Sequence, residues 1–184
     1  GLIVARIAGP EVVGILAFGT AYISIWGFLK GLFGTGHIKL ISEGKPIDKC
    51  LATYTWLQGI SVLLFFLAVA VLFLVQNYFF TGYFESSTEK VVILILLLAN
   101  VVDQFLDFGN STFTAKLEQA KANFPLVIKA LLYNLGRIVV VFIGFKAIGL
   151  ASVNLVSALI ALPFAWRLLR KLEFGKFDKD LFRE

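Results

Sequence analysis

Five long apolar segments place the strongest constraint on how this chain can fold. They run over residues 11–33, 51–75, 91–114, 125–143 and 150–169. Each is close to the roughly 20 residues that a helix needs to cross about 30 Å of hydrocarbon. A soluble domain could not bury this much apolar surface. We therefore predict an all-α integral membrane protein, a polytopic helical bundle of five full transmembrane helices plus the end of one more that precedes residue 11.

The composition agrees with a membrane location and excludes several classes of function. Charged residues make up 16% of the chain and hydrophobic residues 59%, whereas a soluble domain carries about 25% charged residues. Cys50 and His37 are the only cysteine and histidine, which excludes an internal disulfide and a cysteine or histidine metal cluster. Phosphate-binding loops and catalytic motifs are also missing from the sequence. We predict a protein that is not an enzyme, has no resident cofactor and binds no nucleic acid.

Lysine and arginine residues are concentrated on one side of the predicted membrane. If the five segments alternate in direction, twelve of these residues fall on one side and three on the other. The larger set is Lys39, Lys45, Lys49, Lys116, Lys121, Lys129, Arg167, Arg170, Lys171, Lys176, Lys179 and Arg183, and the smaller set is Arg6, Lys90 and Lys146. Because short cytoplasmic loops are enriched in Lys and Arg, we predict a multi-pass protein of the cell membrane with a cytoplasmic C-terminal tail.

The boundaries of the segments give a simple division of the chain. Residues 1–171 form the predicted transmembrane lobe, and residues 172–184 a cytoplasmic amphipathic linker in which phenylalanines alternate with charged residues. Residues 116–125 have the pattern of a short polar turn, with Pro125 in the first turn of the next helix. Lys30 lies near the inner end of the first segment, where its side chain is predicted to reach the cytoplasmic interface.

The third segment carries polar residues that a lipid-facing helix would not tolerate. Asn100, Asp103, Asp107 and Asn110 are spaced three, four and three residues apart, which places them on one helical stripe, and Gln104 lies beside them. A carboxylate at the centre of a membrane helix costs at least about 2.5 kcal/mol on insertion scales. The stripe therefore faces water or protein. It predicts the wall of a cavity, or a Na⁺ or H⁺ site, with a polar seam between helices as the plainer interpretation.

Arg137 is the matching cation in the fourth segment, with Asn134 one turn before it. A guanidinium group stays charged and presents a fork of donors that suits phosphate or carboxylate. Two hypotheses follow with equal weight. Arg137 points into a cavity and holds an anionic headgroup, or it pairs with Asp103 or Asp107 on the neighbouring helix.

Three ordered stretches resemble the N-terminal half of the multidrug/oligosaccharidyl-lipid/polysaccharide flippase superfamily, in particular its O-antigen-type polysaccharide flippases. Residues 6–16 follow the pattern R-x-x-G-P-E-x-x-G-x-L. Residues 34–44 contain G-x-G, an apolar stretch and then Ser-Glu-Gly, and residues 171–184 are similar to the linker before the seventh helix of that family. The resemblance covers essentially the whole chain.

The resemblance implies one lobe of a two-lobed transporter with 12 to 14 helices. In that superfamily a central cavity alternates its access between the two sides of the membrane and moves a lipid-linked oligosaccharide outward. Most of one lobe is present here, with little of the first helix and without a second lobe. The chain is therefore expected either to be a fragment or to pair with another chain.

Three functions remain open at this point. The first is flipping of a polyprenyl-(pyro)phosphate-linked oligosaccharide, with membrane lipid and the second lobe as partners. Its substrate-binding residues would be Arg137, Asn134, Asn100, Asp103, Gln104, Asp107 and Asn110, and no metal is implied. The second is a cation-coupled multidrug exporter of the same superfamily, in which the acids bind Na⁺ or H⁺. The third is a non-transporting scaffold or assembly subunit, which predicts that the polar stripe and Arg137 close on one another in a dry seam.

Overall fold

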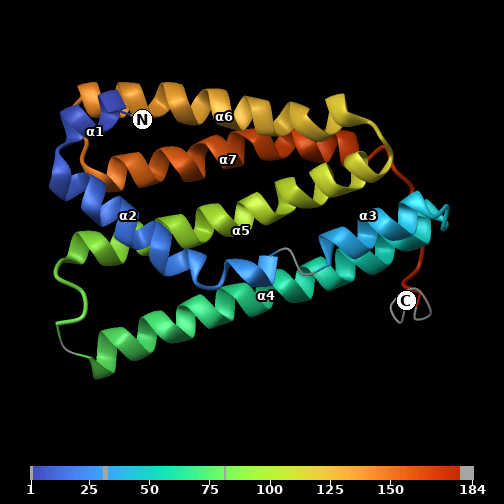
Figure 1. The fold of residues 1–184 in the computed structure, drawn as a ribbon, viewed down its shortest axis with the longest axis horizontal. Helices are drawn as coiled ribbons and strands as arrows, with labels where there is room; N and C mark the ends of the chain where they lie inside the picture. The colour runs from blue at the N-terminus through green and yellow to red at the C-terminus, as the bar shows by residue number, and fades with distance from the viewer. Residues whose placement is uncertain (1, 31–32, 81, 179–184) are drawn as a thin grey trace.

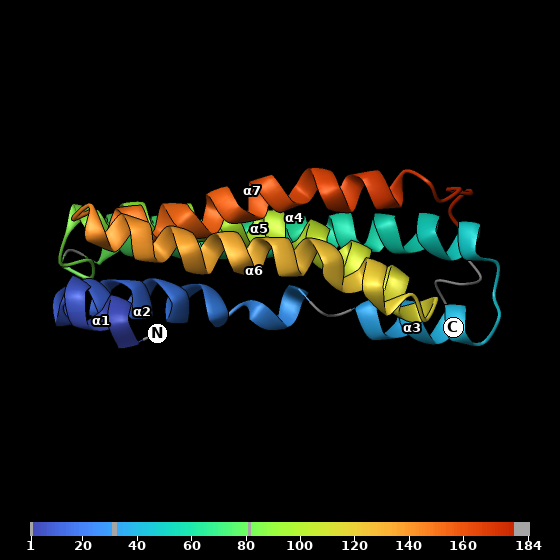
Figure 2. The ribbon, with the colours of Figure 1, turned by 90° about the horizontal axis from the view of Figure 1, so that it is seen from above.

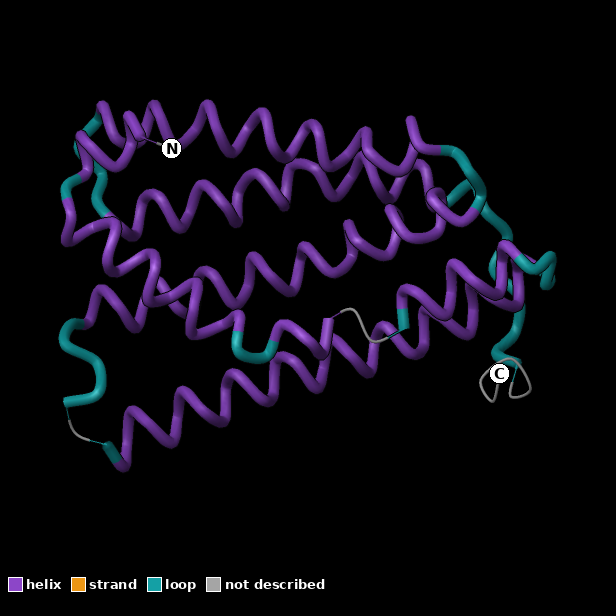
Figure 3. The backbone as a smooth tube through the Cα atoms, in the orientation of Figure 1, coloured by secondary structure: helices purple, strands orange, loops and turns teal. Residues whose placement is uncertain are grey.

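The computed structural model describes residues 2–30, 33–80 and 82–178, and its elements are all helical within those ranges. Figure 1 shows an elongated bundle whose helices run side by side along one axis, and Figure 3 marks the short loops between them. Four helices are long and apolar enough to cross a membrane. These are α4 (Ile47–Phe79), α5 (Ser87–Ala115), α6 (Gln119–Phe142) and α7 (Ala147–Leu169). The predicted polytopic helical bundle is confirmed.

The first predicted segment differs from a single straight helix. It consists of α2 (Pro10–Ser24), a 3₁₀ turn η1 (Gly27–Lys30) and α3 (Gly34–Ser42), and the two halves are inclined by 57°. A short helix α1 (Leu2–Ala8) precedes them. A break inside a membrane frees backbone carbonyls that need a partner. The hydroxyl of Ser61 on α4 donates to the carbonyl of Leu29 in η1 and so satisfies one of them.

Helix α5 is the centre of the bundle and contacts α2, α3, α4, α6 and α7. Its closest neighbour is α7, which presents a stripe of small buried residues. The stripe comprises Ala147, Ala151, Ser157, Ala158, Ala161 and Ala165. Small side chains let two membrane helices approach closely and gain dispersion contacts, because there is no hydrophobic driving force between helices in lipid. Figure 2 shows that α1, α2 and α3 form a separate layer beside α6.

The lysine-rich turns all lie at the same end of the bundle, as the sequence predicts. The turn between α3 and α4, the turn between α5 and α6, and the end of α7 meet at the right of Figure 1. The opposite end carries the aromatic turn between α4 and α5, where Ser86 caps α5 by accepting from the backbone N–H of Glu89. The side of the membrane on which each end lies stays a prediction.

The start of α6 corrects one sequence prediction. The helix begins at Gln119, so Pro125 lies inside it and not in its first turn. The turn is reduced to Lys116, Leu117 and Glu118, with Leu117 in the left-handed region at φ 60°. Glu118 contacts Lys121 at 2.7 Å, and this hydrogen-bonded ammonium lowers the pKa of the Glu118 carboxyl. The charged pairs around the turn let the helix begin in the polar interface, six residues before the apolar stretch.

The first part of the C-terminal linker packs back against the bundle. Residues 170–178 leave α7 without forming a helix and return to the first turns of α4, while residues 179–184 lie outside the described ranges. The backbone N–H of Gly175 donates to the carbonyl of Asp48 at 3.0 Å. Asp178 forms a 3.1 Å ion pair with Lys49, and its backbone N–H donates to Thr53. We call residues 170–178 the C-terminal strap.

Candidate functional site

A cluster of charged and polar side chains lies at mid-length in the bundle, where α5 faces η1 and α6. The ammonium of Lys129 donates to Asp103 at 2.5 Å, and both side chains are about one-fifth exposed. Lys30 donates to the amide oxygen of Asn100, and its ammonium lies 4.9 Å from the ring centre of Phe65. Asp107 is exposed one turn from Asp103. We call Lys30, Asn100, Asp103, Asp107 and Lys129 the mid-span cluster.

Two members of this cluster are not where the sequence analysis placed them. The loop pattern predicts an inner-loop position for Lys129, but it lies in the third turn of α6 and binds Asp103. The sequence predicts that Lys30 reaches the interface, but the break between α2 and α3 directs its side chain to Asn100, near the middle of α5. Both corrections have the same cause. A lysine ammonium that lies several helical turns from the interface pairs with the nearest hydrogen-bond acceptor inside the bundle.

The pairing of α5 with α6 fixes where Arg137 lies. The side chain of Asn110 on α5 donates to the carbonyl of Ala122 on α6. Asp103 lies seven residues before Asn110, and its partner Lys129 lies seven residues after Ala122, so the two helices run antiparallel in a fixed register. Arg137 is a further eight residues along α6, which at 1.5 Å per residue is about 12 Å from the level of Lys129. It is half-buried, and its guanidinium lies 5.1 Å from the ring centre of Tyr133. One of the two hypotheses paired Arg137 with Asp103 or Asp107. In the structure Lys129, and not Arg137, is the partner of Asp103.

The other predicted site residues take different surroundings. Gln104 is fully buried and accepts a 3.4 Å hydrogen bond from Gln58 on α4, so in this conformation it contacts protein and not an open cavity. Asn134 is exposed on α6 and bonds the carbonyl of Ala130 in its own helix. The structure thus brings together Asn100, Asp103 and Asp107, and separates Gln104, Asn134 and Arg137 from them.

His37 forms a second polar junction that the sequence analysis did not assign. It is 3% exposed on α3, and its ring stacks on Tyr54 of α4 with ring centres 4.0 Å apart. Its Nε2 lies 3.1 Å from the hydroxyl of Thr112, which itself donates to the carbonyl of Phe108. Nε2 must therefore carry the proton, and Nδ1 has no partner among the described residues. The only signal in the sequence is that this single histidine directly follows Gly34-Thr35-Gly36.

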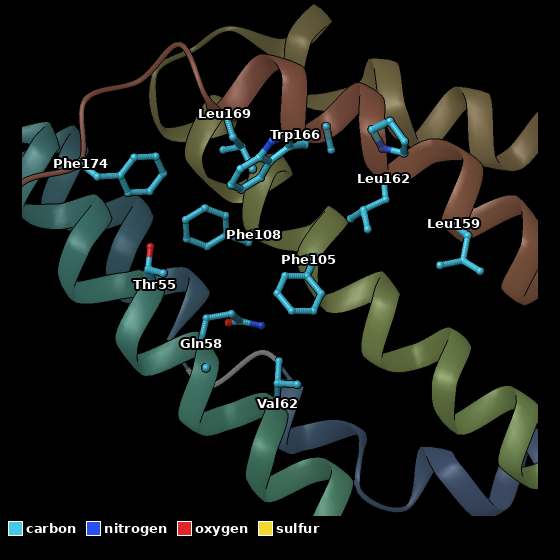
Figure 4. A pocket seen from close by; sticks show the side chains of 13 residues that line it. Thr55, Gln58, Val62, Phe105, Phe108, Leu159, Leu162, Trp166, Leu169 and Phe174 are labelled. Atoms are coloured by element: carbon cyan, nitrogen blue, oxygen red, sulfur yellow. The ribbon is translucent and has the colours of Figure 1, made fainter.

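An apolar pocket lies on the opposite face of α5 from the mid-span cluster. Figure 4 shows it between α4 and α7, with Phe105 and Phe108 of α5 as its floor. Its volume is about 680 Å³, and Thr55 and Gln58 are the polar residues among those that line it. Phe174 of the C-terminal strap closes one end. No sequence pattern indicates this pocket, because its walls have the same composition as any lipid-facing surface.

The mid-span cluster has defined chemical capacities. It holds two ammonium groups and two carboxylates within one short stretch of the bundle. Asp103 is neutralised by Lys129, whereas Asp107 has no ion-pair partner within 4 Å among the described residues. Lys30 is held by a neutral amide and keeps its charge uncompensated at short range. The site can therefore offer a cation to an anionic group, or a carboxylate to a small cation.

No protein-family model, curated protein or solved structure matches this chain. The fold and the site define its class: an all-α, multi-pass membrane protein in which a charged cluster is held at mid-span.

Proposed function

We propose that this chain is one lobe of a transporter that flips a polyprenyl-(pyro)phosphate-linked oligosaccharide across the cell membrane by alternating access, with the C-terminal tail in the cytoplasm. The observation that carries the proposal is the pair of lysines, Lys30 and Lys129, held at mid-length in a membrane bundle. Ionisable groups at such a depth are costly and mark substrate or ion pathways.

The arrangement of the two lysines suits a phosphate that arrives and leaves. Lys30 is bonded to an uncharged amide, so a phosphate oxygen would gain a charge-assisted hydrogen bond there without breaking an ion pair. Lys129 is already bound to Asp103, and a phosphate would have to compete with that carboxylate. Binding that is opposed by an internal counter-ion is weak enough for release, which transport requires. Arg137, farther along α6, offers a third cation on the path to the outer end.

A cation-coupled exporter is the second candidate, and one observation favours it. Asp103 and Asp107 are one turn apart on α5, and Asp107 is exposed and outside any ion pair of the described residues. A free carboxylate next to a paired one can bind Na⁺ or H⁺. The scaffold interpretation predicted a dry seam that joins the stripe to Arg137. The separation of Arg137 from Asp103 by about two helical turns does not favour it.

Arg137 and Lys30 give the test of the proposed function. In the complete two-lobed protein in proteoliposomes, we expect Arg137→Gln and Lys30→Gln each to lower flipping of a fluorescent polyprenyl-pyrophosphate sugar by about tenfold, because a hydrogen bond to a charged group contributes about 1.5–3 kcal/mol. Thermal unfolding should change little. Gln at position 30 can still donate to Asn100, and Arg137 has no acid partner among the described residues.

Lys146→Gln, in the exposed turn between α6 and α7, is the matched control and should flip at the wild-type rate. Normal flipping by stable Arg137→Gln and Lys30→Gln variants would contradict the proposal. Flipping that depends on a Na⁺ or proton gradient and is lost in Asp107→Asn, but not in Lys30→Gln, would favour the exporter.

A further inference from the structure

The apolar pocket between α4 and α7 has features that the proposed function does not use. Its volume of about 680 Å³ falls within the 300–1,000 Å³ typical of small-molecule sites. It lies at the outer surface of the bundle, where its lining residues Phe105, Leu159 and Trp166 are about half to two-thirds exposed, between two helices long and apolar enough to cross a membrane. Leu159 and Leu162 form the wall toward the end that lies farthest from the C-terminal strap. In a bilayer, hydrocarbon chains surround this surface.

The walls suit a hydrocarbon chain better than a polar ligand. The hydroxyl of Thr55 is already bonded to the carbonyl of Leu51 in its own helix, and the amide nitrogen of Gln58 donates to Gln104. The buried Oε1 of Gln58 is the one atom of these two side chains without a partner among the described residues. The remaining lining is aliphatic or aromatic. A hydrocarbon chain that enters the pocket would therefore exchange lipid neighbours for protein neighbours. It has no polar group that would be left unpaired there.

A cationic rim lies at the end of the pocket nearest the polar interface. Pro163 and Trp166 of α7 line the pocket. Arg170 comes seven residues after Pro163 and four after Trp166, so it lies on the same helical face, one turn beyond the mouth of the pocket. Arg167 and Lys171 are its exposed neighbours. Tryptophan is enriched at membrane interfaces, and basic residues there attract anionic lipid headgroups.

The C-terminal strap fixes the direction in which a chain can lie. Phe174 covers the end of the pocket toward α4, and the strap is held there by the bonds from Gly175 to Asp48 and from Asp178 to Lys49 and Thr53. Phe174 therefore blocks a headgroup on the α4 side of that end, whereas Trp166 on the α7 side is 65% exposed. The open side next to Trp166 and Arg170 is the position left for it.

From this complementarity of shape and charge we propose that the pocket is a binding site for an anionic membrane phospholipid, with one hydrocarbon chain over Phe105 and Phe108 and the phosphate at Arg170. The site is on the opposite face of α5 from the mid-span cluster. The proposal is therefore independent of which substrate is transported.

Glycine 59 allows the pocket to be filled without disturbing the core. It lines the pocket on α4, and a Cβ atom added there would meet no other atom within 4 Å. Gly14 on α2 is a matched control, since it is also helical and exposed and also has open space around it. Native mass spectrometry of the purified full-length protein, titrated with dioleoyl phosphatidylglycerol or dioleoyl phosphatidylcholine, measures the binding.

We expect phosphatidylglycerol to bind the wild-type protein more tightly than phosphatidylcholine. Gly59→Phe should weaken both lipids by at least about tenfold, since the ring occupies the space of the chain, and Gly14→Phe should weaken neither. Arg170→Gln should weaken phosphatidylglycerol alone, by about fivefold, as expected for one basic residue beside an anionic lipid. Gln58→Leu should leave binding unchanged, because a hydrocarbon chain needs no polar partner.

Four results would overturn the proposal. Equal lipid binding by Gly59→Phe and wild type would show that the pocket is not the site. Loss of binding in Gln58→Leu would assign the pocket to a polar ligand. A wild-type dimer that dissociates in Gly59→Phe would assign it to a second copy of the chain. An equal loss of both lipids in Arg170→Gln would contradict the headgroup position.

Discussion

Replacing Lys129 by Leu is expected to lower the free energy of unfolding by about 2 kcal/mol, because Asp103 would be left at mid-span without its cation. Removing one partner of a fully buried pair costs about 3–5 kcal/mol, and this pair retains about one-fifth of its exposure, so the effect is smaller. Leucine enters a membrane helix more readily than lysine. Any loss of stability therefore reports the unpaired carboxylate. Thermal unfolding of the purified protein in detergent measures it.

The double variant Lys129→Leu with Asp103→Leu separates the ion pair from other effects. It should regain most of the stability, since neither charge then remains. Lys146→Leu, at an exposed position in the turn between α6 and α7, should change stability by no more than about 0.5 kcal/mol. Single and double variants that are equally destabilised would show that the 2.5 Å contact contributes nothing.

The second large effect is expected at Gly136, where α6 meets α7. A Cβ atom at this position would lie 2.7 Å from Cγ1 of Val153. Valine in a helix has one strongly preferred rotamer and cannot turn away. Gly136→Ala should therefore destabilise the bundle by about 1–2 kcal/mol, as overpacking does, even though alanine is the better helix former. Chemical or thermal unfolding checks this value.

Val153→Ala provides the rescue for Gly136→Ala. Removing both γ-carbons leaves the Cβ of residue 153 at 3.7 Å from the new methyl group, which is ordinary contact. The double variant should be close to wild type. Gly14→Ala, where nothing lies within 4 Å, should be neutral or stabilising. A Gly136→Ala variant as stable as wild type would mean that α6 and α7 pack less closely than described.

The spans could be predicted because hydrophobic length is a property of the sequence alone. The third segment's polar stripe could also be predicted, since helical spacing places Asn100, Asp103 and Asp107 on one face. The break between α2 and α3 could not. Glycine is common in membrane helices, so Gly27 carries no clear signal, and the break is stabilised by a contact from Ser61 on another helix.

The pairing of side chains was the least predictable part. Lys129 follows four apolar residues and so already lies inside the fourth apolar segment, a signal that its count among loop residues overlooked. Its partner, however, depends on the register of α5 against α6, which only the folded bundle fixes. The same register places Arg137 away from the acids. The pocket and the C-terminal strap arise from contacts between distant segments and have no local pattern.

We expect one face of α5 to meet water or a polar substrate at mid-span, and the opposite face to meet hydrocarbon. Asp107 and Phe105 test it on a single helix. They are two residues apart, about 3 Å in depth, and about 200° apart around the axis. Asp107 belongs to the mid-span cluster, and Phe105 to the apolar pocket. Cys50 is buried and would first be replaced by alanine.

The decisive measurement is the rate at which a charged, water-soluble thiol reagent modifies a cysteine at each position in the protein embedded in lipid vesicles. We predict that Asp107→Cys reacts at least about tenfold faster than Phe105→Cys, since the charged reagent is excluded from hydrocarbon. A lipid with a brominated chain should quench a fluorophore at position 105 and not at 107. Equal, slow modification of both cysteines, with quenching at position 107, would contradict the account.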